Sequence, residues 1–326
     1  MPVARRRLDA PAPLRLWHLA SLDAPTVAVV WALGFAWAAR VKLPPWVPVL
    51  LALVAWTVYI ADRLLDARNG LRTGEIQRLR ERHFFHHRHR KILGSLAVAS
   101  ACIAAWIVFS LMPAGALERN SLLAAAAVAY FSGVHTSRRL PQVLTPLLSK
   151  EFLVGVLFTA ACVQPSLSRA AAGPGEPPWP PIAVAAYFAA LAWLNCQSIE
   201  RWESEAAEQT GKALVARKGT SFSPYMNPAK PDRALASEIQ NSDNSRLICS
   251  SAPAVLLTLA GLLQAAVLLP IEPRTAALVA AGTLSALLLA LLDRLRNRFT
   301  PLALRSAADL VLLSPALVWP IALLCR

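Results

Sequence analysis

The chain has 326 residues, of which 56% are apolar, and it carries 33 Lys and Arg against 19 Asp and Glu, a formal net charge of +14. Its apolar runs approach the roughly 20 residues that cross a bilayer, so the composition excludes a water-soluble domain and predicts an all-α, polytopic membrane protein. Five scattered cysteines exclude a disulfide framework and a zinc-binding spacing.

The chain begins with a segment, residues 1–21, that contains arginines but no long apolar core, and we expect no cleaved signal peptide. A membrane domain of nine spans is expected over residues 22–326. The first span opens on Asp23 and Pro25, which is typical of a helix start. The predicted spans are 22–39, 44–61, 92–112, 120–134, 148–165, 180–198, 248–270, 274–292 and 302–324.

Two carboxylates follow the second span. Asp62 and Asp66 are four residues apart, so they share one face if the helix continues. Such a pair can hold Mg²⁺, and the basic segment that follows, ending at Lys91, can hold the phosphates that Mg²⁺ usually accompanies. The alternative is a pair of ordinary surface ion pairs, Asp62 with Arg63 and Asp66 with Arg68.

A histidine-rich tract lies in the same segment, over residues 82–90. His83 and His87 have the i, i+4 spacing of a transition-metal site, but the neighbouring cations oppose a metal. Contact with phosphate or lipid head groups and a solvated basic loop are the other interpretations.

The charge distribution predicts the topology. With nine spans, most of the 33 Lys and Arg fall on the N-terminal side of the membrane, in residues 1–21 and in loops at about 62–91, 135–149, 199–247 and 293–301. This asymmetry places the N-terminus in the cytoplasm and the C-terminus outside, in the cytoplasmic (inner) membrane. It also explains the net charge through topology and contact with membrane lipid. The basic loops lack the aromatic residues typical of nucleic-acid binding, so we expect no nucleic acid.

A second acidic cluster follows the sixth span. Asn195, Ser198, Glu200, Glu203 and Glu205 offer oxygen ligands over about three helical turns. Taken alone, the cluster is typical of a solvated helix end. It falls on the same side of the membrane as the first acidic pair, however, and the two together favour one site.

Two features have structural alternatives. Asp309 lies inside the ninth predicted span, where an ionisable group indicates function, but Arg305 four residues earlier can form a helix-internal pair with it. The polar segment 206–247 is long enough to be a lid or to be disordered.

This layout resembles the UbiA superfamily of intramembrane prenyltransferases, which have nine helices and acidic motifs after the second and sixth. Asp62 and Asp66 occupy the last two aspartates of the family's first motif, while Val58 and Tyr59 replace its Asn-Asp pair. Glutamates replace the aspartates of the second motif. Lys150 resembles the family's lysine at the start of the fifth helix, without the usual preceding tyrosine.

The resemblance implies a nine-helix UbiA-like bundle and a Mg²⁺-dependent transfer of an isoprenoid chain from a prenyl diphosphate to an acceptor that the sequence does not identify. It implies a catalytic and metal-binding set of carboxylates, and a basic set, including Lys150, that binds the diphosphate. The metal ligands would be Asp62, Asp66, Glu200 and Glu203. The basic set would be Lys150, Arg63, Arg68, Arg138 and Arg139.

The rival hypothesis is a membrane protein without catalysis, either a transporter or a scaffold that binds prenyl lipids. The replaced Asn-Asp pair supports it. The acids and the lysine expected on one side of the membrane oppose it, because a fold kept only for packing does not need them there.

Overall fold

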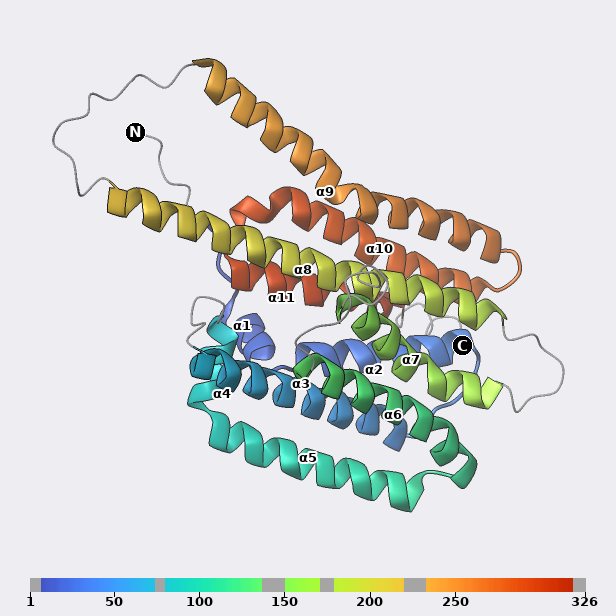
Figure 1. The fold of residues 1–326 in the computed structure, drawn as a ribbon. Coiled ribbons are helices and arrows are strands. Elements are labelled where there is room, and N and C mark those ends of the chain that lie inside the picture. The colour runs from blue at the N-terminus through green and yellow to red at the C-terminus, as the bar shows by residue number, and fades with distance from the viewer. Residues whose placement is uncertain (1–6, 74–79, 137–149, 171–178, 220–232, 319–326) are drawn as a thin grey trace.

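The computed structural model describes residues 7–73, 80–136, 150–170, 179–219 and 233–318, and for 73, 130–136, 150, 179–181, 208–219, 233–250 and 318 only the backbone. These residues form helices, with one isolated bridge between Leu8 and Phe299. The helices in chain order are α1 (Ala12–Leu19), α2 (Asp23–Ala38), α3 (Trp46–Thr73), α4 (Glu81–Arg88), α5 (Arg90–Leu111), α6 (Ala114–Thr136), α7 (Lys150–Ala170), α8 (Trp179–Gly219), α9 (Arg233–Leu268), α10 (Pro273–Leu295) and α11 (Pro301–Val311), with short 3-10 turns η3 (Arg296–Arg298) and η4 (Ser314–Val318) (Figure 1).

The all-α, membrane-spanning fold class is confirmed, but the count of nine spans is not. Among the described residues six helices are long and apolar enough to cross a membrane, and the bent pair α1–α2 raises the number to seven. The six lie in α3, α5, α7, α8, α9 and α10. The nine-helix UbiA-like arrangement therefore stays a hypothesis.

The ninth predicted span, 302–324, is interrupted within the residues that the structure describes, and its part from 319 on lies outside them. Its helix α11 has 11 residues and ends at Val311, so it covers about half of a 30 Å hydrocarbon layer. The chain then turns through η4, where Pro315 has no N–H to continue a helix. The carbonyl freed at Leu312 accepts a hydrogen bond from Trp31 Nε1 at 2.8 Å.

Several helices run past the predicted spans. Helix α3 continues to Thr73, so the Asp62–Asp66 pair lies on a helix rather than in a loop. Helix α8 continues to Gly219, and α9 begins at Arg233. Hydropathy marks where a helix can cross the hydrocarbon, and it does not mark where the helix itself ends.

The core is aromatic in the middle and close-packed through small residues. Trp31 of α2 and Phe188 of α8 are fully buried and stack with ring centroids 3.8 Å apart. Helices α7 and α8 approach so closely that a Cβ on Gly155 would lie 3.0 Å from the backbone nitrogen of Trp193. Small residues at such contacts let membrane helices pack backbone to backbone.

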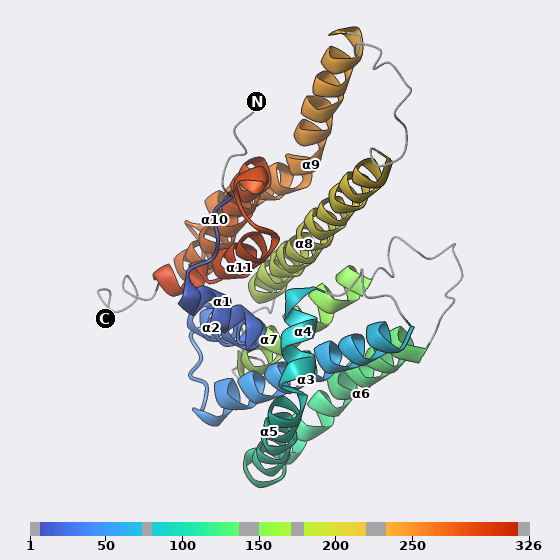
Figure 2. The ribbon, with the colours of Figure 1, turned by 90° about the vertical axis from the view of Figure 1, so that its left-hand side faces the viewer.

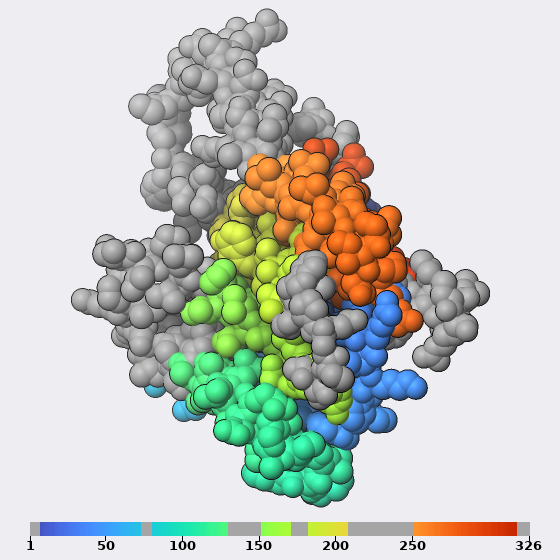
Figure 3. All heavy atoms as spheres, turned by 90° about the vertical axis from the view of Figure 1, so that its right-hand side faces the viewer, coloured from blue at the N-terminus to red at the C-terminus, as the bar shows by residue number. Residues whose placement is uncertain are grey.

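Two helices present apolar side chains outward. Helix α5 exposes Trp106 and Phe109, and α9 exposes Leu259 and Leu263. Figure 1 places α5 and α9 at opposite edges of the bundle, and Figure 3 shows the turns that follow them, green and orange, on separate parts of the surface. Exposed apolar surface on this scale is typical of lipid contact.

Charged residues gather at the other end of the bundle, which we call the charged end. It comprises α1, α4, the C-terminal parts of α3, α8 and α10, and the N-terminal part of α11 (Figure 1). Figure 2, which faces this end, shows α1, α4 and α11 between α8–α10 on one side and α3, α5 and α6 on the other.

Candidate functional site

A sharp corner between α1 and α2 begins the site. The two helices meet at 89°, and Ser21 between them has a φ of 56°, a left-handed conformation that few residues adopt. Trp56 Nε1 donates to the Ala20 carbonyl at 2.9 Å and fixes the corner. The corner brings His18, at the end of α1, beside Asp23, at the start of α2.

We call the resulting buried group the His18 cluster. His18 Nδ1 lies 2.7 Å from Asp23 Oδ2 and 3.5 Å from Oδ2 of Asp309, which comes from α11. Arg63 of α3 reaches Asp23 Oδ2 at 3.6 Å, and Asn195 Nδ2 of α8 donates to Asp309 Oδ1 at 3.3 Å. Side chains from five helices therefore meet at one buried point.

A second buried group, the Glu203 cluster, lies beside it. Glu203 Oε1 accepts hydrogen bonds from Arg82 Nη1 at 2.6 Å and from Arg305 Nη1 at 2.8 Å. Arg80 Nε lies 3.6 Å from Oε2, and Arg80 Nη2 donates to the Glu203 carbonyl at 3.0 Å. One carboxylate thus holds α4, α8 and α11 together through guanidinium groups.

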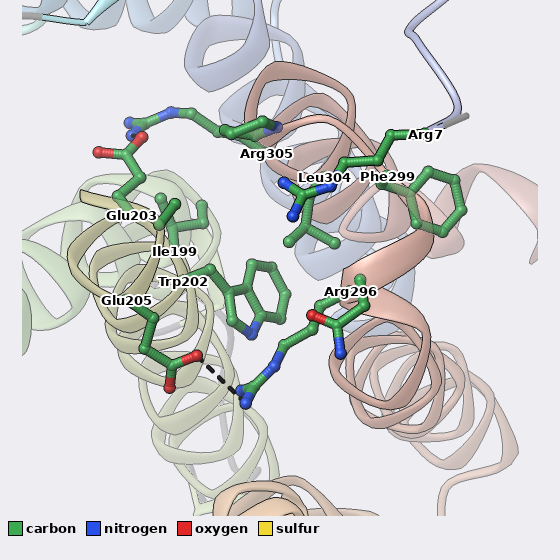
Figure 4. Close-up of a pocket in the computed structure, with 12 residues that line it drawn as sticks. Arg7, Ile199, Trp202, Glu203, Glu205, Arg296, Phe299, Leu304 and Arg305 are labelled. Carbon is green, nitrogen blue, oxygen red and sulfur yellow. Dashed lines mark hydrogen bonds and ion pairs between the residues drawn. The ribbon is translucent and has the colours of Figure 1, made fainter. Parts of the chain in front are cut away.

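A cleft opens next to the Glu203 cluster. Figure 4 shows Glu203 and Glu205 on its α8 side and Arg7 and Arg296 across from them, with Arg296 Nη2 paired to Glu205 Oε2 at 3.1 Å. The lining combines basic groups with apolar ones: Arg7, Ile199, Trp202, Glu203, Glu205, Ala206, Arg296, Asn297, Phe299, Pro301, Leu304 and Arg305. Its lining does not include Asp62, Asp66 or Glu200.

The histidines of α4 are structural in part. His86 Nδ1 donates to the Arg82 carbonyl at 2.7 Å, which leaves Nε2 to accept from Ser21 Oγ at 3.1 Å. His83 Nδ1 accepts from the Arg80 backbone N–H at 2.9 Å and caps the helix. The buried pair is therefore His83 and His86, whereas His87, whose i, i+4 spacing from His83 would allow a transition-metal site, is only partly buried.

Burial shifts the pKa values of three side chains of α4. It lowers the pKa of His83 to about 3 and that of His86 to about 4, with nearby guanidinium groups adding to the effect. It also lowers the pKa of Arg82 to about 10. At neutral pH both histidines are therefore uncharged, and Arg82 remains a cation.

The carboxylates predicted from the first motif lie on one face of α3. Asp62 and Asp66 are partly buried and have interactions of their own. Two carboxylate groups four residues apart supply the oxygen donors that Mg²⁺ prefers, so the residues fit that ion.

The two glutamates predicted as metal ligands from the second acidic cluster differ in burial. Glu200 is exposed, whereas Glu203 is buried with its oxygens bound to arginines, so a cation at Glu203 would have to displace them. The metal role of these two residues stays a prediction, weaker for Glu203 than for Glu200.

The predicted basic set is also divided. Arg63 is buried, with its guanidinium 5.7 Å from the ring centre of Tyr59, while Arg68 is exposed. Lys150 is the first residue of α7, and only its backbone is described. Arg138 and Arg139 lie outside the described residues.

The sequence did not single out His18, and it assigned Arg305 a different partner. The helix-internal pair of Arg305 with Asp309, one of the two explanations that the sequence left open for Asp309, is not a direct contact, because Arg305 binds Glu203 and Asp309 lies by His18 and Asn195. The position of Asp309 inside an apolar span was a signal for a buried site. His18, near the end of a polar segment, gave none.

Comparison of the chain with protein-family models, with curated proteins and with solved structures returned no match in any of the three.

Proposed function

We propose that this protein is a UbiA-like prenyltransferase, which transfers an isoprenoid chain from a prenyl diphosphate to an aromatic or lipid acceptor in a Mg²⁺-dependent reaction. The observation that carries the proposal is the burial of ionisable groups from α1, α2, α3, α4, α8 and α10, with partly buried ones from α11, at one end of an apolar bundle. Burying so many charges beside hydrocarbon is costly, and such groups in membrane helices typically mark a functional site.

The chemistry of the substrate matches that arrangement. A prenyl diphosphate has a multiply charged head and an apolar tail, so its enzyme needs cations near the membrane surface and apolar helices behind them. An arginine can donate two hydrogen bonds to one phosphate group, and the charged end supplies Arg82 from α4, Arg305 from α11 and Arg80 directly before α4. Apolar α5, α7 and α10 run away from this end.

The proposed roles follow from residue type. Asp62 and Asp66 would hold Mg²⁺ with help from Glu200, and the ion would neutralise the diphosphate as the C–O bond breaks. Lys150 and the arginines Arg63, Arg68, Arg138 and Arg139 would stabilise the departing diphosphate. A ring carbon of an aromatic acceptor, or the hydroxyl oxygen of a lipid acceptor, would then bond to the allylic cation and release its proton.

The same proposal includes a position in the cell. We place the protein in the cytoplasmic membrane with its charged end and N-terminus toward the cytoplasm, since basic segments are retained on that side. The charged head group of a prenyl diphosphate is hydrophilic, so the substrate would enter from the cytoplasmic side.

A non-catalytic transporter or prenyl-lipid scaffold is the second candidate, and two observations favour it. Val58 stands where the resemblance implies a polar metal ligand, and its apolar side chain is 45% exposed. Glu203 is engaged by arginines rather than turned toward a cation site. Either feature suits a protein that kept the fold without the full metal site.

The test is a titration of the purified chain with a prenyl diphosphate, with and without Mg²⁺, in detergent or nanodiscs. Asp62→Asn and Asp66→Asn keep the size of the side chain and remove its charge, so each is expected to abolish Mg²⁺-dependent binding and to lower any transfer rate by orders of magnitude. Asp9→Asn, at an exposed carboxylate, is the matched control and should bind like the native chain.

Binding of the native kind by both Asn variants would end the claim that the Asp62–Asp66 pair is the active site. Mg²⁺-dependent binding without any transfer to candidate acceptors, or equal stabilisation by the prenyl alcohol alone, would favour the scaffold.

A further inference from the structure

We infer that the His18 cluster is a binding site for one divalent transition-metal ion of the Zn²⁺ type, formed by His18, Asp23 and Asp309. None of these residues is assigned to the binding of Mg²⁺ or diphosphate in the proposed prenyl transfer, although their burial is part of the charged end on which that proposal rests. The three donor atoms lie within 4.8 Å of one another and come from α1, α2 and α11.

The two carboxylates are oriented for a shared ligand. Asp23 Oδ1 accepts the backbone N–H of Ala24 at 3.0 Å, and Asp309 Oδ1 accepts from Asn195 Nδ2 at 3.3 Å. Each aspartate therefore has one oxygen held by a neighbour and turns the other, Oδ2, toward His18 Nδ1. Metal-binding carboxylates are typically fixed in this way by hydrogen bonds to the oxygen that does not bind.

The His18 ring gives a second reason to expect a ligand, because its nitrogens are buried without hydrogen-bond partners. His18 is fully buried, and neither of its ring nitrogens makes a hydrogen bond of normal geometry, although Nδ1 lies close to both Oδ2 atoms. Asn195 Oδ1 is a further buried atom without a partner. Buried polar groups are rarely left without partners, because losing contact with water is costly, and a cation among these atoms would satisfy Nδ1.

The donor set selects the metal. One imidazole nitrogen with two carboxylate oxygens suits Zn²⁺, Mn²⁺ or Fe²⁺ and does not suit Mg²⁺ or Ca²⁺, which take oxygen ligands. Donors about 2.0–2.1 Å from a tetrahedral Zn²⁺ lie about 3.3 Å apart. The observed separations of 2.7 and 3.5 Å from Nδ1 lie on either side of that value, so small side-chain adjustments would complete the site.

The surroundings allow the ion to enter and to be tolerated. The Asp309 side chain is 15% exposed, whereas those of His18 and Asp23 are 0% and 3% exposed, so entry is past Asp309. Three protein ligands leave a fourth position for water. Arg63, 3.6 Å from Asp23 Oδ2, opposes a cation, but a metal would replace any proton that His18 carries and so add less than its full charge.

The competing explanation is a metal-free ion pair network, in which a protonated His18 bridges the two aspartates. Direct measurement of metal binding separates the two. The full chain, purified in detergent and treated with a chelator, is titrated with Zn²⁺ by calorimetry while its melting temperature is recorded. Co²⁺ is then added as a spectroscopic probe, because its visible absorption reports the number and type of ligands.

We expect about one equivalent of Zn²⁺ to bind with a rise in melting temperature, because a ligand that binds only the folded state stabilises it. His18→Gln and Asp309→Asn should each lose this binding and the Co²⁺ absorption. Asp9→Asn should retain both, since Asp9 is an exposed carboxylate outside the cluster. Mg²⁺ alone should neither bind at this site nor displace Zn²⁺.

Absence of saturable Zn²⁺ binding to the native chain would overturn the inference, as would binding that survives in both His18→Gln and Asp309→Asn. Neither outcome would refute the proposed function, which depends on Mg²⁺ binding at Asp62 and Asp66. If His18→Gln does not fold, the native titration and the nearly isosteric Asp309→Asn still decide the question.

Discussion

Removing the charge of Glu203 is expected to destabilise the protein by about 3 kcal/mol. Glu203→Gln leaves Arg82 and Arg305, which now bind the carboxylate at 2.6 and 2.8 Å, facing each other without a counter-charge. Breaking a buried ion pair by removing one partner costs about 3–5 kcal/mol. Since the Glu203 side chain is 11% exposed and glutamine keeps one acceptor oxygen, the lower end of that range applies.

The assay is reversible unfolding in mixed micelles, followed by tryptophan fluorescence, with a matched control on the same helix. Glu205 is 37% exposed and has an ion pair with Arg296 at 3.1 Å, so Glu205→Gln should cost at most about 1 kcal/mol. In the double variant Arg82→Gln/Glu203→Gln the cost should be well below the sum of the single costs, because the two residues are in contact. If Glu203→Gln is as mild as Glu205→Gln, the partly buried Arg82 and Arg305 do not depend on Glu203 and the reasoning fails.

The same variant separates the two roles considered for Glu203. As a metal ligand, its loss would weaken the Mg²⁺-dependent binding of a prenyl diphosphate. As a counter-charge, its loss would free Arg82 and Arg305 and strengthen the binding measured without Mg²⁺. The observed contacts favour the second result.

Two other predictions concern α4 and the helix contacts. Lowering the pH from about 6.5 toward 4 should destabilise the protein. The pKa values of His83 and His86 in the folded state, about 3 and about 4, lie below the unfolded value of 6.5. In this pH window the two histidines therefore take up protons only in the unfolded chain, which favours unfolding. The free energy of unfolding measured against pH checks this, and His86→Gln should flatten the curve; an unchanged slope would contradict it. Gly155→Ala should destabilise the α7–α8 contact, because its Cβ would lie 3.0 Å from the Trp193 backbone nitrogen. Gly94 has open space around its Cβ position, so the control Gly94→Ala should raise the free energy of unfolding by about 0.5–1 kcal/mol. Equal shifts in melting temperature for the two alanine variants would argue against the close approach.

The helices that the sequence predicted best are those whose boundaries coincide with a change in hydropathy. The spans predicted at 92–112 and 274–292 correspond to α5, Arg90–Leu111, and α10, Pro273–Leu295. Charged residues precede both apolar runs, Pro113 follows the first and Asp293 and Arg294 end the second, so the pattern and the helix end together. Where a helix continues into polar sequence, as α8 does to Gly219, the apolar pattern stops before the helix does.

The buried clusters were beyond the reach of sequence patterns because their members are far apart in the chain. His18 and Asp309 meet across nearly the whole sequence, and no periodicity relates them. The i, i+4 spacing of Arg305 and Asp309 predicted a local pair, since such residues share a helix face. In the folded protein the longer arginine side chain extends to Glu203 of α8 instead, where its charge is matched.

Two short helices cover the buried charge at the charged end. Helix α1 supplies His18 and α4 supplies Arg82, and each helix has eight residues. Helices of this length are not stable alone in water, so both depend on their contacts with the bundle. The contact of Ser21 with His86 joins the α1–α2 corner to α4, and the contact of Arg82 with Glu203 joins α4 to α8. A change that loosens α4 therefore also loosens the corner that positions His18, and the effects of variants at the two clusters should be non-additive.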